Sequence, residues 1–272
     1  MTPTTLELHQ WLPQIRRIAV AAGDAILAIY NQSESVAVQH KADDSPLTAA
    51  DLAAHQLIMQ ELQLLTPNIP VLSEEAADIP WSVRQHWQCY WLVDPLDGTK
   101  EFIKRNGEFT VNIALIIHGE PVLGVIHAPV LGKTYSGGFG FGAFVEDANG
   151  EKLIHAVTPK ADETVRLVGS KSHYEPAVEH YLTQFPHHEL VAVGSSLKFC
   201  LVAEGTAHIY PRFGPTMLWD TGAGHAIAVA AGATVVYDGI EGPAYHREHL
   251  RNGHFIVQRP PSAIGTIDKL GK

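Results

Sequence analysis

Cysteine and long apolar runs are scarce in this sequence. Its only cysteines, Cys89 and Cys200, lie too far apart in the chain to form a metal-binding knuckle, so we expect two buried thiols. No segment approaches the roughly 18 consecutive apolar residues of a membrane span. The amino terminus also lacks a charged region followed by an apolar stretch. We therefore expect a cytoplasmic protein without an integral membrane segment; a peripheral position at the inner membrane stays open.

Runs of basic residues are absent as well. The formal net charge of -10 argues against a nucleic-acid polymer as partner, because its phosphates require a surface rich in lysine and arginine. A small anionic ligand is compatible with this charge, since a bound metal ion offsets local acidity. The 16 histidines are scattered, and we assign no zinc site to them. What the chain does have is 46% hydrophobic residues, enough for one large domain or two.

The sequence DPLDGT, residues 94–99, directly follows the apolar run of residues 90–93. That run predicts a buried strand, so Asp94 and Asp97 would leave a sheet at its carboxyl end. The intervening glycine permits close backbone approach to a ligand, and a helix beginning at Thr99 would offer free N–H groups. Carboxylates beside free amides suit Mg²⁺ together with a phosphate. An ordinary solvated turn is the alternative interpretation.

Carboxylates in three other places favour the metal interpretation. Glu74 and Glu75 follow a short apolar run that predicts a strand, and Asp220 precedes a helix rich in small residues. Asp51 lies early in a helix that we expect from Thr48 to Leu65. If these groups converge, they repel one another by roughly 1 to 4 kcal/mol per close pair. Divalent cations would relieve that repulsion.

The remaining pattern indicates layers of helix and sheet. Apolar spacing predicts a long helix over residues 6–30, and short strands with a hairpin signal at 118–121 predict an antiparallel sheet between 71 and 145. Beyond residue 150, strands and helices alternate, which predicts a second layered unit. We expect the following divisions: an N-terminal α+β domain with most metal ligands (1–155), a C-terminal α/β domain with Asp220 and the nucleotide contacts (156–260), and a tail (261–272).

These motifs resemble the Mg²⁺-dependent, lithium-sensitive phosphatase superfamily that includes the inositol monophosphatases. The matching segments are residues 74–75, 94–99 and 219–220 with the small-residue helix that follows. Three further segments resemble the bacterial 3′(2′),5′-bisphosphate nucleotidase branch: 99–102 (TKEF), 194–200 (GSSLKFC) and 210–212 (YPR). The resemblance implies an α+β or α/β fold of alternating layers, αβαβα, as in inositol-monophosphatase-like sugar phosphatases. One departure is Gly222, where the resemblance leads us to expect alanine.

The resemblance implies two Mg²⁺ sites. Glu74, Asp94 and the backbone carbonyl of Leu96 would hold one ion. Asp94, Asp97 and Asp220 would hold the second, so that Asp94 bridges both. A third ion near Glu74 is compatible with this pattern. Paired metals about 4 Å apart stabilise the attacking and leaving oxygens of an in-line displacement.

The resemblance also implies a catalytic pair and a substrate pocket. Asp51 and Thr99 would orient and deprotonate the attacking water, without a phosphoenzyme. The expected substrate contacts are Glu74, Leu96, Asp97, Gly98, Thr99, Ser170, His173, Gly194, Lys198, Arg212 and Asp220. Within this set, the amides of Gly98 and Thr99 would hold the reacting phosphate, Gly194, Lys198 and Arg212 the second phosphate, and Ser170 and His173 the base and sugar side. Lys198 and Arg212 are equally compatible with surface salt bridges, and Ser195 and Ser196 with caps of a helix at Leu197.

The expected reaction converts adenosine 3′,5′-bisphosphate (PAP) to AMP and phosphate, a role linked in this branch to sulfate assimilation; PAPS is a second candidate substrate. The partner is thus a small nucleotide, and the oligomeric state stays open. Three alternatives remain. One is an inositol or sugar monophosphatase on the same scaffold, and another a catalytically silent nucleotide or metal sensor. The third, a phosphatase of the haloacid-dehalogenase type, is disfavoured because two residues, not one, separate Asp94 from Asp97.

Overall fold

The structure is a computed structural model that describes residues 3–31, 38–40, 46–169, 176–237 and 244–259. In the first half of the chain the elements are α1 (Thr5–Tyr30), β1 (Val38–His40), β2 (Pro46–Thr48), α2 (Ala49–Leu65), β3 (Val71–Ser73), η1 (Glu74–Ala76), α3 (Trp81–Arg84), β4 (Cys89–Asp97), α4 (Thr99–Ile103), β5 (Thr110–Ile117) and β6 (Glu120–Ala128). In the second half they are β7 (Lys133–Gly138), β8 (Gly142–Asp147), β9 (Gly150–Ile154), β10 (Val165–Gly169), α5 (Pro176–Leu182), β11 (His188–Ala192), α6 (Leu197–Ala203), β12 (Ile209–Arg212), α7 (Leu218–Ala230), β13 (Thr234–Tyr237) and β14 (Phe255–Gln258).

A seven-stranded sheet in the order β3-β4-β5-β6-β7-β8-β9 forms the first layer of strands. Only β3 and β4 pair in parallel; the other neighbours are antiparallel. The predicted hairpin is confirmed between β5 and β6, where His118 and Gly119 both have positive φ, 52° and 80°. Such a pair of residues matches the right-handed twist of the flanking strands. All eight residues of β5 are buried, because helices cover the sheet on both faces.

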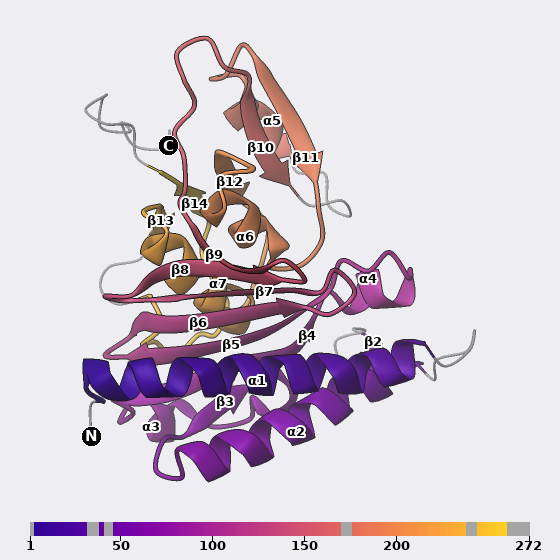
Figure 1. Ribbon diagram of the computed structural model, residues 1–272, viewed down its shortest axis with the longest axis vertical. Coiled ribbons are helices and arrows are strands. Elements are labelled where there is room, and N and C mark those ends of the chain that lie inside the picture. Colours follow the sequence, from indigo (N-terminus) through magenta and orange to yellow (C-terminus); the bar gives the residue numbers. More distant parts are fainter. Residues whose placement is uncertain (1–2, 32–37, 41–45, 170–175, 238–243, 260–272) are drawn as a thin grey trace.

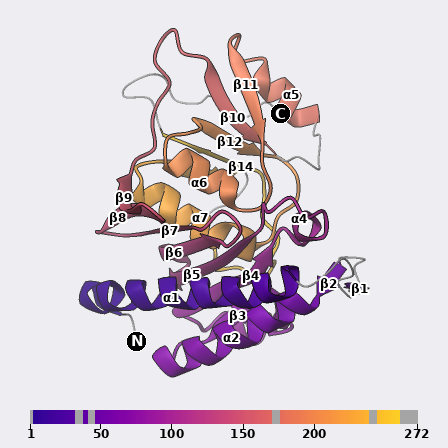
Figure 2. The same ribbon diagram turned by 45° about the vertical axis from the view of Figure 1, so that its right-hand side comes forward.

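The helices α1 and α2 cover one face of this sheet, as Figures 1 and 2 show. α1 is the predicted long amphipathic helix: its apolar stripe is buried, and Thr4 and Glu7 form a capping box at its start. Pro13 lies inside α1. α2 also agrees with the prediction, because the chain becomes helical directly after Thr48.

A second sheet of five strands, in the order β11-β10-β12-β14-β13, lies beyond the opposite face. Helices α6 and α7 are sandwiched between the two sheets, and α5 packs on the outer face of the smaller one (Figure 2). The layer order is therefore αβαβα, and the predicted fold class is confirmed. The apolar core between the sheets takes residues from both halves of the chain, from Leu72 to Val257. A domain boundary at residue 155 and the separate tail stay predictions.

The small residues of α7 bring this helix very close to the large sheet. A Cβ atom on Gly222 would lie 2.9 Å from Leu92 Cδ2, and one on Gly124 of β6 would lie 2.9 Å from Ala223 Cα. The glycine at position 222 thus permits tight packing of α7 against β4. This contact places the start of α7 beside the carboxyl ends of β3 and β4. Within the described residues, no helix combines the length and apolarity that crossing a membrane requires.

Candidate active site

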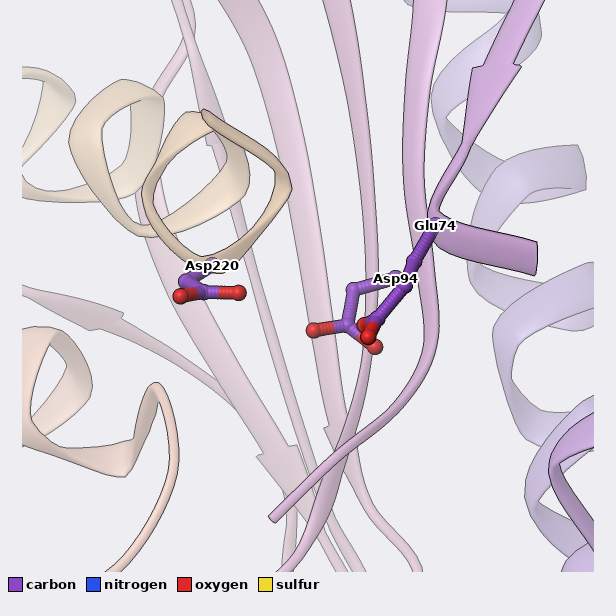
Figure 3. A group of neighbouring side chains, drawn as sticks. All are labelled: Glu74, Asp94 and Asp220. Carbon is purple, nitrogen blue, oxygen red and sulfur yellow. The ribbon is translucent and has the colours of Figure 1, made fainter. Parts of the chain in front are cut away.

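Three carboxylates from distant parts of the chain converge at this junction (Figure 3). Glu74 begins the short helix η1 after β3, Asp94 lies in β4, and Asp220 lies in the first turn of α7. Each contributes an oxygen atom, and these oxygens lie within 4.8 Å of one another. The structure therefore brings together three of the five predicted metal ligands in one cluster.

Each negatively charged carboxylate of the cluster makes ionisation of its neighbours less favourable. Burial raises the pKa of Asp94 well above its usual range, and the charges of Glu74, Asp97, Asp220 and Asp51 raise it further. Burial and then Asp97 likewise raise the pKa of Asp220. Buried carboxylates in such proximity require protons or cations to neutralise them. A donor set made only of carboxylate oxygens fits a hard divalent cation such as Mg²⁺.

Asp97 stands at the edge of this cluster and is held by two side chains that the sequence did not reveal. The register of β4 against β5 shifts between Asp94 and Asp97. Asp97 Oδ2 accepts hydrogen bonds from Ser196 Oγ at 2.6 Å and from Asn112 Nδ2 at 3.3 Å. Asn112 is a buried amide in the otherwise largely apolar strand β5, a signal that could have identified it. Of the two serines interpreted as caps of α6, Ser196 makes no side-chain capping hydrogen bond, whereas the Ser195 hydroxyl accepts from Leu197 N at 3.4 Å.

The turn after Asp94 has the expected form. Asp94 Oδ1 accepts from Leu96 N at 3.1 Å, and the Thr99 hydroxyl donates to the Leu96 carbonyl at 3.4 Å. Gly98 has φ +94°, which favours glycine, and α4 begins at Thr99 as predicted. The predicted catalytic residue Asp51 is buried in the first turn of α2. Its effect on the pKa of Asp94 shows that its charge acts on the cluster.

A cavity of about 180 Å³ adjoins the carboxylates. Its walls include six of the predicted site residues: Asp97, Gly98, Gly194, Lys198, Arg212 and Asp220. The chain packs tightly at Gly194, where an added Cβ would lie 2.7 Å from Glu101 Cγ and 2.8 Å from the Glu108 carbonyl. The Gly194 N–H donates to Glu108 Oε2 at 2.9 Å. The cavity thus has an acidic end shared with the carboxylate cluster and cationic side chains on its wall.

Lys198 is buried and supplies positive charge to this wall. Its ammonium donates to the carbonyls of Ser195 at 2.6 Å and Val193 at 3.3 Å. Burial lowers the pKa of Lys198 to about 8, although the nearby Asp97 opposes this shift. Ser195 itself has φ +47°, an uncommon backbone conformation for serine. Lys198 therefore stabilises the loop before α6 as well as facing the cavity.

Arg212 ends β12 on the same cavity wall, where its guanidinium donates to the Pro215 carbonyl at 3.1 Å. The charge of Arg212 adds to the effect of burial in lowering the pKa of Lys198, and it partly opposes the rise in the pKa of Asp220 that burial causes. The predicted contacts Ser170 and His173 lie outside the described residues. Cys89 and Cys200 are buried and free, as expected.

Comparison with known proteins agrees with this geometry. A profile described as the inositol monophosphatase family matches residues 7–260. The chain therefore belongs to the inositol monophosphatase family. It is 57% identical over 225 residues to the 3′(2′),5′-bisphosphate nucleotidase CysQ of Shigella flexneri, covering 82% of this chain and 89% of that protein. The CysQ of Escherichia coli K12 is 56% identical over the same coverage.

Comparison with solved structures leads to the same family. A crystal structure of CysQ from Bacteroides thetaiotaomicron, a bacterial member of the family, matches with a TM-score of 0.78 and 44% identity, covering 89% of this chain and 94% of that one. An IMPase from Thermotoga maritima, 23% identical with a TM-score of 0.74 over 92% of each chain, shares the fold. The resemblance to the bacterial nucleotidase branch is confirmed.

Proposed function

We propose that this protein is a Mg²⁺-dependent 3′(2′),5′-bisphosphate nucleotidase that hydrolyses PAP to AMP and phosphate. The observation that carries the proposal is the convergence of Glu74, Asp94 and Asp220 beside a cavity with Lys198 and Arg212 on its wall. An acidic cluster suits cations and a reacting phosphate, whereas the two cationic side chains suit a second anionic group. High identity to proteins named CysQ supports the substrate class.

The proposed metal ligands follow the carboxylate cluster. Glu74, Asp94 and the Leu96 carbonyl would hold one ion, and Asp94, Asp97 and Asp220 a second, with a third near Glu74. Bound Mg²⁺ would supply charge neutralisation, a lowered pKa of water and stabilisation of the charged phosphate oxygens. The hydrogen bonds from Ser196 and Asn112 would fix the orientation of Asp97 Oδ2.

The protein groups would then divide the work of hydrolysis. The Thr99 hydroxyl would orient the attacking water, and the carboxylate of Asp51 would accept its proton through that hydroxyl. The backbone N–H groups of Gly98 and Thr99 would donate to the reacting phosphate. Lys198 and Arg212 would bind the other phosphate of the nucleotide, with Gly194 beside them and Ser170 and His173 toward the base and sugar. PAPS would fit the same pocket, because it keeps the 3′-phosphate.

A phosphate-release panel tests this assignment. PAP, PAPS, inositol 1-phosphate and fructose 1,6-bisphosphate are each assayed with Mg²⁺ and with chelator. We expect the highest kcat/KM for PAP, and no release from any substrate in chelator. A higher kcat/KM for inositol 1-phosphate would contradict the substrate and favour the monophosphatase alternative. Tight nucleotide binding with no turnover of any compound would instead favour a sensor.

Substitution of Asp94 tests the mechanism separately from the substrate. Asp94→Asn keeps the oxygen that accepts from Leu96 N but removes the charge shared by both proposed metal sites. We expect loss of PAP turnover together with loss of Mg²⁺-dependent stabilisation. Wild-type turnover in Asp94→Asn at saturating Mg²⁺ would contradict the bridging role of Asp94.

A further inference from the structure

Asn252 is a buried amide in an irregular segment, residues 244–252, with only 7% of its surface exposed. Its Nδ2 lies 2.7 Å from the Met217 carbonyl and 3.1 Å from the hydroxyl oxygen of Thr216 and of Thr221, and these three acceptors share its two N–H groups. Arg247 Nη2 donates to Asn252 Oδ1 at 2.7 Å. Because arginine has no acceptor, this bond requires the amide oxygen to face Arg247 and the NH₂ group to face the start of α7.

The residues that Asn252 contacts are those that set the conformation of Asp220. The Met217 N–H donates to Asp220 Oδ2 at 2.8 Å, and the Asp220 N–H donates to the Met217 carbonyl at 3.2 Å. Asn252 donates to that same carbonyl. The side-chain amide of Asn252 therefore contacts Met217, the residue whose carbonyl accepts from the Asp220 backbone and whose N–H donates to the Asp220 carboxylate.

The Thr221 hydroxyl adds a second connection to the same turn. It donates to the Leu218 carbonyl at 3.2 Å and accepts from Asn252 Nδ2 and from the Tyr245 hydroxyl, both at 3.1 Å. All three hydrogen-bonding positions of this buried hydroxyl are thus used. Since Thr216 and Thr221 also line the cavity, the network lies directly behind its wall.

The segment that carries Asn252 is also attached to the opposite side of the carboxylate cluster. The Tyr90 hydroxyl, on the strand of Asp94, donates to the Tyr245 carbonyl at 2.7 Å. The guanidinium of Arg84, which follows η1, donates to the carbonyls of Glu248 at 2.9 Å and Arg247 at 3.2 Å. Residues 244–252 therefore bridge the element that carries Asp220 and the elements near Glu74 and Asp94.

We infer that Asn252 is a positioning residue that holds Asp220 at the distance from Glu74 and Asp94 that divalent-cation binding requires. The inference rests on the proposed role of Asp220 as a metal ligand. Side chains that orient metal ligands typically change metal affinity about 10–100-fold when they are altered. The irregular segment 244–252 therefore acts in metal binding without contributing a ligand.

Asn252→Asp is the sharpest test, because it keeps the side-chain shape and the oxygen that faces Arg247. It replaces the donor toward Met217 by an oxygen that repels the carbonyl. Thr134→Val is the matched control: it removes one buried hydrogen bond, to His127 Nδ1, on the strand β7 away from the cluster. Mn²⁺ binding is titrated by electron paramagnetic resonance without substrate, and Mg²⁺ dependence is measured by PAP turnover and by Tm.

For Asn252→Asp we expect the Kd for Mn²⁺ and the half-saturating Mg²⁺ concentration to rise about 10–100-fold. KM for PAP at saturating Mg²⁺ should change far less. Thr134→Val should lower Tm and leave the Mn²⁺ affinity as in the wild type. If Asn252→Asp does not fold, Arg247→Met frees the Asn252 amide, and a smaller loss of Mn²⁺ affinity is expected.

Wild-type Mn²⁺ affinity in a folded Asn252→Asp, or in Arg247→Met if only that variant folds, would overturn the inference and leave the proposed function intact. An equal loss of Mn²⁺ affinity in Thr134→Val would also overturn it, because the effect would then follow from stability alone. A wild-type protein that binds no Mn²⁺ and needs no Mg²⁺ would overturn the proposed function first and this inference with it.

Discussion

His225 shows how far burial alone changes the protonation of a single residue. It lies in α7 next to Gly224, and its Nδ1 is 3.2 Å from the Tyr245 hydroxyl. Burial lowers the pKa of His225 from 6.5 to about 4. The unfolded chain therefore binds this proton more tightly than the folded chain. The stabilising contribution of neutral His225 is complete above pH 6.5 and is lost as the pH falls toward 4.

We expect protonation of His225 to lower the free energy of unfolding of the wild type by up to about 3 kcal/mol between pH 7 and pH 4. His225→Asn cannot take up the proton and should be less sensitive to acid. Urea unfolding at several pH values between 4.5 and 8 measures the difference, with pH 8 giving the cost of altered packing alone. If the free energies of unfolding of the wild type and of His225→Asn change with pH in the same way, the lowered pKa of His225 is contradicted.

The local sequence around each residue also determines which site residues could be predicted. Asp94, Asp97, Glu74 and Asp220 were predictable, because each follows an apolar strand or precedes a helix and so has a local pattern. Asn252 was not, since it lies in an irregular segment and contacts residues about 35 positions away in the chain. Contacts of this kind depend on how α7 lies against the segment, which no local pattern encodes.

At the scale of elements, the positions of the helices could be predicted from the spacing of apolar residues. How closely the helices pack against the sheet could not. The bounds of α1 and α2 agree with those predicted from the sequence within a few residues. β4, by contrast, continues past the expected end at residue 93 as far as Asp97, through Pro95 and a shift of register. A proline ordinarily ends pairing, and only the irregularity allows the strand to continue.

Gly124 tests whether the approach of α7 to the sheet matters for the site. An added Cβ would collide with the Ala223 carbonyl, which is backbone and cannot rotate away. We expect Gly124→Ala to destabilise the protein by about 1–3 kcal/mol and to raise the half-saturating Mg²⁺ concentration, because α7 carries Asp220. Tm and Mg²⁺-dependent PAP turnover provide the measurements.

Gly132→Ala is the control for this substitution. A Cβ there meets no atom within 4 Å, and only the φ of +60° opposes alanine, at a cost of about 1–2 kcal/mol. Its Mg²⁺ dependence should remain that of the wild type. If Gly124→Ala keeps wild-type Mg²⁺ dependence despite a lower Tm, the metal site does not depend on the close approach of α7 to the sheet.

At the scale of the whole molecule, the carboxylate cluster lies where α7 packs against the large sheet, and its charges oppose folding. Asp94 lies in the large sheet, Glu74 in the short helix η1 that follows strand β3 of that sheet, and Asp220 in a helix packed between both sheets. Without cations, the raised pKa values of Asp94 and Asp220 mean that the folded state holds protons more tightly than the unfolded chain. Stability in chelator should therefore decrease as the pH rises through these raised values. Bound Mg²⁺ would offset this loss.

Asp94→Asn tests, at pH 7.5, how much carboxylate repulsion destabilises the protein and how much Mg²⁺ binding offsets it. In chelator, the variant removes repulsion of roughly 1–4 kcal/mol per close pair, so its Tm should exceed that of the wild type by several degrees. In Mg²⁺ at about 100 times Kd, each occupied site stabilises the wild type by about 2.7 kcal/mol, whereas the variant lacks the carboxylate shared by both proposed sites, so the Tm advantage of the variant should shrink. Calorimetry with chelator and with Mg²⁺ measures both effects. If Asp94→Asn is the less stable protein under both conditions, the carboxylates do not repel one another strongly enough for metal binding to determine the stability of the fold.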